Sequence, residues 1–173
     1  MLHLAFEDKA FFQKGDVFID GLLKLGINLE GTDDWNRQTP LLTAIEKGAP
    51  ADKIELLLNA GAEVDACDIL KRSALHYLVK EWTFDSQRSP DEYFKLTDLL
   101  LSKGLNINVV DKDGNTPLHV IASYRAENSE AINYLVQKGA DLKAVNKDGL
   151  TPLEVAQTKK SKNAEYLKSF APS

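Results

Sequence analysis

The chain has 173 residues, with 21 Lys and Arg against 26 Asp and Glu, which gives a formal net charge of −5 at pH 7. This balance, without any Lys or Arg block, argues against a nucleic-acid ligand, because nucleic-acid-binding proteins usually neutralise phosphates with a basic surface. Hydrophobic residues make up 43% of the chain and charged residues 27%, a composition typical of a folded soluble protein and too apolar for a disordered one.

Two sets of short motifs recur along the chain. The first set is a Ser or Thr followed by Pro or Ala and then Leu, with spacings of 34, 43 and 35 residues, and its members begin at Thr39, Ser73, Thr116 and Thr151. Each member of the second set is a glycine followed by an aliphatic, a polar and another aliphatic residue. These glycines are spaced by 35, 43 and 35 residues, at Gly26, Gly61, Gly104 and Gly139. Because both sets share one period and the same enlarged third unit, the sequence predicts a stack of repeated units.

Each unit is predicted to contain a turn, a short helix, a loop and a longer helix. The short helices begin after the Ser or Thr of the first motif, and Pro suits the first helical position because its missing N–H would have no partner there. The longer helices carry apolar residues three and four apart, at Ile54, Leu57 and Leu58, at Tyr93, Leu96 and Leu100, and at Ile132, Leu135 and Val136. We expect the glycine of the second motif to end each longer helix in a left-handed turn.

The third unit is longer than its neighbours, and its extra segment, residues 82–90, is predicted to be a protruding loop between the two helices. We expect Trp82 or Phe84 to fold back on apolar surface. After the loop, Ser89 and Glu92 have the spacing of a capping box, which predicts that helix restarts there. One repeat position is leucine in four units, and these side chains are expected to form a buried ladder: Leu41, Leu75, Leu118 and Leu153.

These motifs resemble the ankyrin repeat, whose pattern runs Asp-x-x-Gly-x-Thr-Pro-Leu-His-x-Ala and then a helix ending Leu-Leu-x-x-Gly-Ala-Asp-Val-Asn. The fourth unit matches best, from Asp111 through Thr116–His119 to Gly139–Leu142. The resemblance implies an all-α ankyrin-repeat solenoid of stacked helix-turn-helix units with short β-hairpin-like fingers. It implies a single domain of five units, the first and last degenerate caps, with boundaries near 1–33, 34–67, 68–110, 111–145 and 146–173.

Residues that could carry chemistry have structural explanations. His76 and His119 stand at the motif position where, by resemblance, histidine orients the inter-repeat turn by hydrogen bonding. With one cysteine and three dispersed histidines, we expect no metal and no cofactor. Cys67 is expected to be a small, partly buried residue, and the Asp111–Asn115 segment lacks the spacing of a calcium loop. No nucleophile or phosphate-binding motif occurs, so no enzyme is predicted.

The remaining candidate is a binding surface. In ankyrin-like folds, the turn fingers and the exposed side of the first helices line a concave face that binds proteins. Position by position, the resemblance assigns this role to Trp35, Asn36, Gln38, Glu46, Lys47, Ile69, Leu70, Arg72, Lys80, Glu81, Lys112, Asp113, Asn115, Ser123 and Tyr124. Apolar groups at finger positions bind a partner or pack on a neighbour, so two interpretations of Trp35 stay open: a binding anchor, or packing against Ile69 between fingers.

The predicted function is therefore a non-catalytic protein–protein interaction module that binds another protein through its concave face and fingers. The alternatives are a regulatory or recruiting subunit of an enzyme assembly, or a bacterial effector delivered into host cells. We expect a monomer without membrane contact, because no stretch approaches the ~20 consecutive apolar residues of a membrane span. The single cysteine and the lack of a signal peptide predict a cytoplasmic location, or secretion into a host cell if the source is an intracellular bacterium.

Overall fold

The computed structural model describes residue 26, residues 28–82 and residues 89–170 of the chain. In this part the secondary structure is helical, without a strand. The helices are α4 (Pro40–Glu46), α5 (Ala51–Asn59), α6 (Ala74–Glu81), α7 (Pro90–Ser102), α8 (Pro117–Ser123), α9 (Ser129–Gln137), α10 (Pro152–Thr158) and α11 (Asn163–Lys168).

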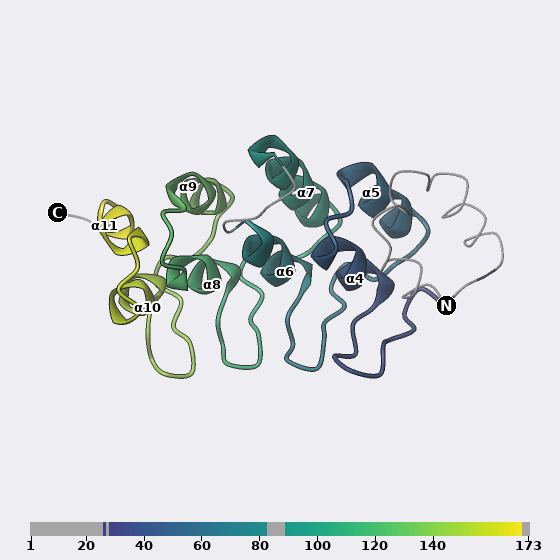
Figure 1. Cartoon of the computed structure of the whole chain (residues 1–173), viewed down its shortest axis with the longest axis horizontal. Coiled ribbons are helices and arrows are strands. Elements are labelled where there is room, and N and C mark those ends of the chain that lie inside the picture. The colour runs from purple at the N-terminus through teal and green to yellow at the C-terminus, as the bar shows by residue number, and fades with distance from the viewer. Residues whose placement is uncertain (1–25, 27, 83–88, 171–173) are drawn as a thin grey trace.

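The helices form two layers that run along the length of the molecule (Figure 1). The inner helices α4, α6, α8 and α10 pack in that order, each against the next, and the outer helices α5, α7, α9 and α11 lie above them. Loops project below the inner layer, and we call four of them the fingers: residues 33–38, 68–72, 111–115 and 146–150. The all-α solenoid is thus confirmed, and the predicted first unit lies almost wholly outside the described residues.

The helix starts follow the predicted capping chemistry. Thr116 and His119 form a reciprocal capping box at α8, and Thr151 and Glu154 form one at α10, each with Pro at the first position. The glycines that end the outer helices also behave as expected, because Gly61, Gly104 and Gly139 have φ of 101°, 99° and 95°. These local signals fix where each helix begins and ends.

Half of the predicted capping box at α7 is wrong. The side chain of Ser89 accepts a hydrogen bond from the backbone N–H of Glu92, as expected. The Glu92 carboxylate, however, accepts from the backbone N–H of Ala51 at 3.1 Å, at the start of α5 in the preceding unit. Pro50, the N-cap residue of α5, supplies no side-chain acceptor, so a residue 41 positions later in the sequence caps the helix and joins two units.

The core consists of two clusters of buried side chains, one centred on α4 to α7 and one on α8 to α11, and the partly buried Trp82 and Ile107 pack against both. Leu41, Leu75 and Leu118 are at most 1% exposed, as predicted, whereas Leu153 in the last described unit is only partly buried. Stacking these faces supplies burial that no single helix pair could achieve.

Aromatic side chains add a second set of contacts around the outer helix α7. The Trp82 ring lies 4.5 Å from the Tyr93 ring and 5.3 Å from the Phe94 ring, centroid to centroid, which confirms that Trp82 folds back on apolar surface. Phe94 in turn stacks on Tyr134 at 4.0 Å and joins α7 to α9. Phe84 and the rest of the predicted loop, residues 83–88, lie outside the described residues.

Two buried histidines connect the third and fourth units to the finger of the unit that follows each, as predicted. His76 Nδ1 accepts from the Ser73 backbone N–H at 3.2 Å, and its Nε2 lies 2.9 Å from the Asn115 carbonyl oxygen. His119 repeats this geometry with Thr116 at 3.2 Å and the Leu150 carbonyl at 3.0 Å. Because a carbonyl only accepts, Nε2 must carry the proton and the imidazole is neutral. Burial lowers the pKa of both histidines and so favours this neutral form.

We predict that the free energy of unfolding falls as the pH decreases from 7 to 5. The unfolded chain takes up protons on these histidines near pH 6.5, whereas the lowered pKa keeps them neutral in the folded chain, so stability rises with pH in this window. The double substitution His76→Gln and His119→Gln should lower stability at pH 7 and flatten this slope. Urea denaturation at each pH provides the measurement, and a variant that kept the full slope would contradict the assignment.

Candidate protein-binding surface

Each finger is closed by an acidic or amide side chain that binds backbone N–H groups of its own loop. Asp68 Oδ1 accepts from the backbone N–H groups of Leu70 and Arg72, both at 2.8 Å. Asp111 and Asn146 make the equivalent pairs of bonds in the next two fingers. These side chains satisfy donors that a loop would otherwise expose, and they hold the finger in one conformation.

Neighbouring fingers are also bonded to one another. The backbone N–H of Ile69 donates to the Asn36 carbonyl at 2.8 Å, that of Lys112 to the Leu70 carbonyl at 2.7 Å, and that of Lys147 to the Asp113 carbonyl at 2.9 Å. One such bond between each pair of neighbouring fingers fixes the position of each finger relative to the next. The side chains at the tips therefore point outward at a spacing that the backbone sets.

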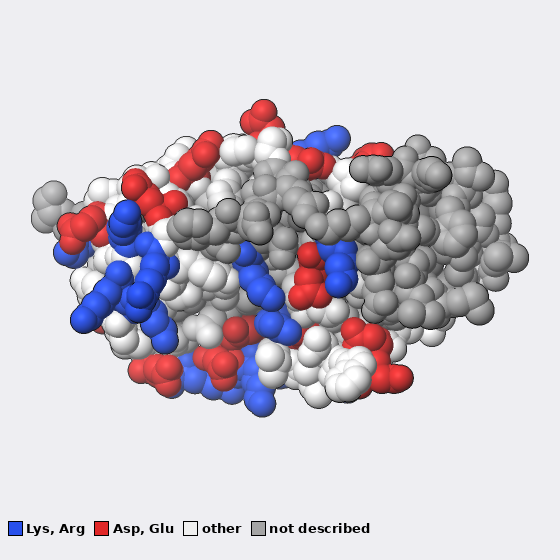
Figure 2. Space-filling view, viewed as in Figure 1, with Lys and Arg blue, Asp and Glu red and all other residues white. Residues whose placement is uncertain are grey.

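Three apolar side chains at the tips of the first two fingers are exposed to solvent. We call them the fingertip patch: Trp35 is 90% exposed, Ile69 55% and Leu70 40%. The alternative in which Trp35 packs against Ile69 is wrong, because such contact would cover the indole. Around the patch, Lys, Arg, Asp and Glu side chains are interspersed along the finger edge of the molecule (Figure 2).

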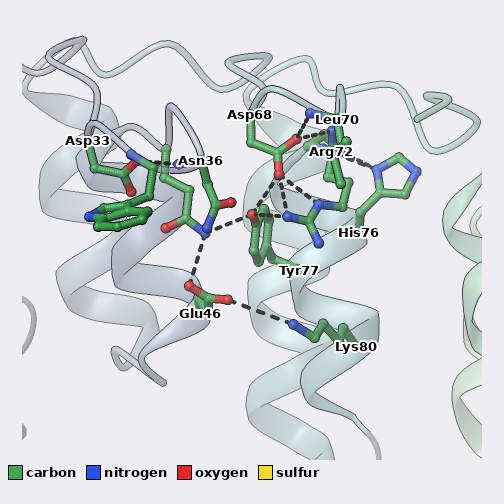
Figure 3. A network of polar contacts seen from close by, with 12 residues as sticks. Asp33, Asn36, Glu46, Asp68, Leu70, Arg72, His76, Tyr77 and Lys80 are labelled. Carbon is green, nitrogen blue, oxygen red and sulfur yellow. Dashed lines mark hydrogen bonds and ion pairs between the residues drawn. The ribbon is translucent and has the colours of Figure 1, made fainter. Parts of the chain in front are cut away.

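Behind the fingertip patch, a polar network joins the second and third units (Figure 3). The Tyr77 hydroxyl accepts from Gln38 Nε2 at 2.7 Å and from Arg72 Nη2 at 3.0 Å, and donates to Asp68 Oδ2 at 2.8 Å. Gln38 Nε2 also donates to Glu46 at 3.0 Å. All hydrogen-bonding positions of the phenol are therefore used by partners from two units.

The charges in this network are compensated. Although burial alone would raise the pKa of Asp68, hydrogen bonds from Arg72 and Tyr77 outweigh it and hold that pKa below its ordinary value. Arg72 binds Asp68 through both Nε, at 2.7 Å, and Nη2, at 2.6 Å. Burial, together with the adjacent Asp68, raises the pKa of the Tyr77 hydroxyl, which stays protonated and able to donate. The network thus fixes the base of two fingers at neutral pH.

The structure divides the predicted contact residues into two groups. The prediction that Gln38 contacts a partner is wrong. Gln38 is only 4% exposed and its amide is bonded within the network, so it holds the fingers in place. Arg72 and Glu46 are partly buried in the same network, and Glu46 also lies 3.8 Å from Lys80. The side chain of Glu81 lies outside the described part.

The other predicted contacts lie on accessible surface and stay predictions. The exposed ones are Trp35, Asn36, Lys47, Ile69, Leu70, Lys80, Lys112 and Asp113, and the half-buried ones are Asn115, Ser123 and Tyr124. Three of them, Asp113, Asn115 and Ser123, meet in one groove of about 330 Å³ between α8 and α10. The sequence did not predict this groove, because its lining comes from two units; the other lining residues are His119, Val120, Asn146, Asp148, Leu150, Val155, Thr158 and Lys159.

Three further features concern the cysteine, possible metal ligands and possible membrane spans in the described part of the chain. Cys67 is exposed, so the expectation of a partly buried residue is wrong. Among the described residues, His, Cys, Asp and Glu do not form a group of three or more that could hold a metal ion. None of the helices from α4 to α11 has the length and apolar character needed to cross a bilayer.

Comparison with known proteins identifies the family. A family model described as ankyrin repeats in three copies matches residues 89–171. A putative ankyrin repeat protein of Rickettsia bellii is 32% identical over 136 residues, which are 73% of this chain and 69% of that protein. The chain belongs to the ankyrin repeat family.

Ankyrin repeat and SOCS box protein 6 is a further relative. The human protein is 36% identical over 120 residues, and the mouse protein is 35% identical over 118 residues. The chain spans only about a quarter of these relatives, 26% of their length. Ankyrin repeats are generally protein–protein interaction modules and are typically not catalytic.

The Tyr77 network yields a test of how the fingers are held. Tyr77→Phe should lower the free energy of unfolding by about 1–3 kcal/mol, because it removes the hydrogen bonds that the buried hydroxyl makes with Asp68, Gln38 and Arg72. Tyr166→Phe is the matched control, since Tyr166 is half-buried and its hydroxyl makes no hydrogen bond to a described residue. Thermal and chemical denaturation give the comparison, and equal effects of the two substitutions would show that the network adds no stability.

Proposed function

We propose that this ankyrin repeat chain is a non-catalytic binding module whose protein partner contacts the fingertip patch and the adjoining concave surface. The observation that supports it most is Trp35, an indole that is 90% exposed on a finger held by backbone bonds. Tryptophan is among the residue types most enriched at binding hot spots, where its removal costs about 2 kcal/mol or more. An exposed apolar patch on an ordered loop is favourable only once it is covered.

The rigidity of the fingers strengthens this proposal. Asp33 Oδ1 accepts from the backbone N–H groups of Trp35, at 3.1 Å, and Asn36, at 2.7 Å. The next finger binds the Asn36 carbonyl through Ile69. Because these bonds order the loop before any partner arrives, binding loses less conformational entropy than it would with a flexible loop.

The charges on the proposed surface favour a protein partner. Lys112 and Asp113 carry opposite charges on the third finger, and Lys47 and Lys80 add positive charge at the ends of α4 and α6. Mixed signs at the rim tune the association rate and the choice of partner, whereas an extended phosphate backbone would be repelled by the carboxylates.

We expect Trp35→Ala to weaken capture of the partner at least tenfold while the melting temperature stays nearly unchanged, because the indole makes little contact with the rest of the chain. The tagged full chain would be used for affinity capture from cell lysate, followed by titration of the captured protein against each variant. Val145→Ala is the control, since Val145 is 61% exposed next to the fourth finger and outside the patch. Undiminished binding by Trp35→Ala would refute the proposed site.

A further inference from the structure

A second surface lies at the other end of the inner helices, away from the fingers. Four basic residues are exposed in the turns that lead from α8 to α9 and from α10 to α11: Arg125, Lys159, Lys160 and Lys162. Among the described residues, the ion pairs involve other side chains, so these four charges are not neutralised there. Figure 2 shows basic side chains gathered at the end of the molecule that holds α10 and α11. We call the four residues the basic cluster.

Buried hydrogen bonds bring the two turns together. The backbone carbonyl of Tyr124 accepts from the hydroxyl of Ser161 and from Asn163 Nδ2, at 2.5 Å and 3.1 Å. The same amide donates to the Ile121 carbonyl at 3.1 Å, and its oxygen accepts from the Asn128 backbone N–H at 2.7 Å. Asn163 is 0% exposed and fully engaged. Arg125 follows the bonded Tyr124, and Lys160 and Lys162 flank Ser161, so the cations share one rigid edge.

The helix dipole explains only part of this basic character. Arg125 and Lys159 follow helices α8 and α10, where a cation favours the negative end of the helix dipole. Lys162 is different, because it is the N-cap residue of α11, where a cation opposes the dipole and its side chain supplies no cap. In a chain with a net charge of −5, this concentration of unpaired cations creates a local field of the opposite sign.

A cleft adjoins the basic cluster. It has a volume of about 370 Å³ and is lined by Trp82, Ala126, Glu127, Asn128 and Lys162. The Trp82 ring gives it an apolar wall that is supported from behind by Tyr93 and Phe94. It therefore offers apolar contact beside a cation, which suits a peptide segment in which an apolar residue neighbours carboxylates.

We propose that the basic cluster and this cleft bind a short acidic segment of a protein. Complementary charge attracts such a segment and orients it, and the cleft can take its apolar side chain. A peptide fits better than a nucleic acid, because four cations cover little of an extended polyanion and Glu127 repels phosphate at the cleft. This surface is independent of the fingertip patch, so it adds a second binding site to the proposed function.

The test uses fluorescein-labelled octaglutamate and the full chain, with binding measured by fluorescence anisotropy at 50 and 300 mM NaCl. We expect saturable binding that weakens at least fivefold at the higher salt, because these charges are exposed and screened. Arg125→Glu combined with Lys162→Glu should weaken binding at least tenfold at 50 mM NaCl. The control pair Lys143→Glu and Lys147→Glu changes the net charge equally, on exposed residues outside the cluster, and should weaken binding less than threefold.

Three results would overturn the proposal: no saturable binding at 50 mM NaCl, equal losses in the two double variants, or tighter binding of twelve-residue oligothymidylate or of phosphatidylserine vesicles with the same dependence on the cluster. If melting curves show that the Glu variant is unfolded, Arg125→Gln with Lys162→Gln replaces it, and the same outcomes apply with a loss of at least threefold expected. Trp35→Ala should leave peptide binding unchanged, which separates this site from the fingertip patch.

Discussion

The structure depends on the register between successive units, because a single pair of short helices cannot bury its apolar face alone. Apolar stacking provides burial but tolerates small shifts, whereas hydrogen bonds between units do not. His76 and His119 supply these bonds by donating to a carbonyl of the following finger. Each imidazole also completes the cap of its own helix. One side chain therefore fixes both the start of a helix and the position of the next unit.

The second unit has Leu42 where the third and fourth units have histidine, so it cannot make this bond. There the network around Tyr77 connects the fingers, with Gln38 from one unit and Asp68 and Arg72 from the next. A lost repeat interaction is thus replaced by a different one at the same junction. Residues that resemble contact positions in a repeat pattern can therefore serve the scaffold, as Gln38 does.

The same rigidity separates two surfaces at opposite ends of the inner helices. At the finger end, backbone bonds hold Trp35, Ile69 and Leu70 outward, and the exposed area is mainly apolar. At the turn end, Asn163 ties two loops together and the exposed groups are mainly basic. Because the two surfaces share no residue and differ in chemistry, we expect substitutions at one end not to disturb the other.

The sequence alone determined the repeat period, the helix boundaries and the fold, because caps, prolines and glycines act over a few residues and recur in every unit. It also predicted the structural histidines and the fold-back of Trp82. It could not decide which finger residues are accessible: Trp35 and Gln38 stand in the same finger, yet Gln38 is buried and Trp35 is exposed. The cap that Glu92 gives to α5 and the hydrogen bond from Ser161 to the Tyr124 carbonyl were likewise decided by the tertiary structure. These bonds join residues 41 and 37 positions apart in the sequence, and only the stacking of units brings such residues within bonding distance.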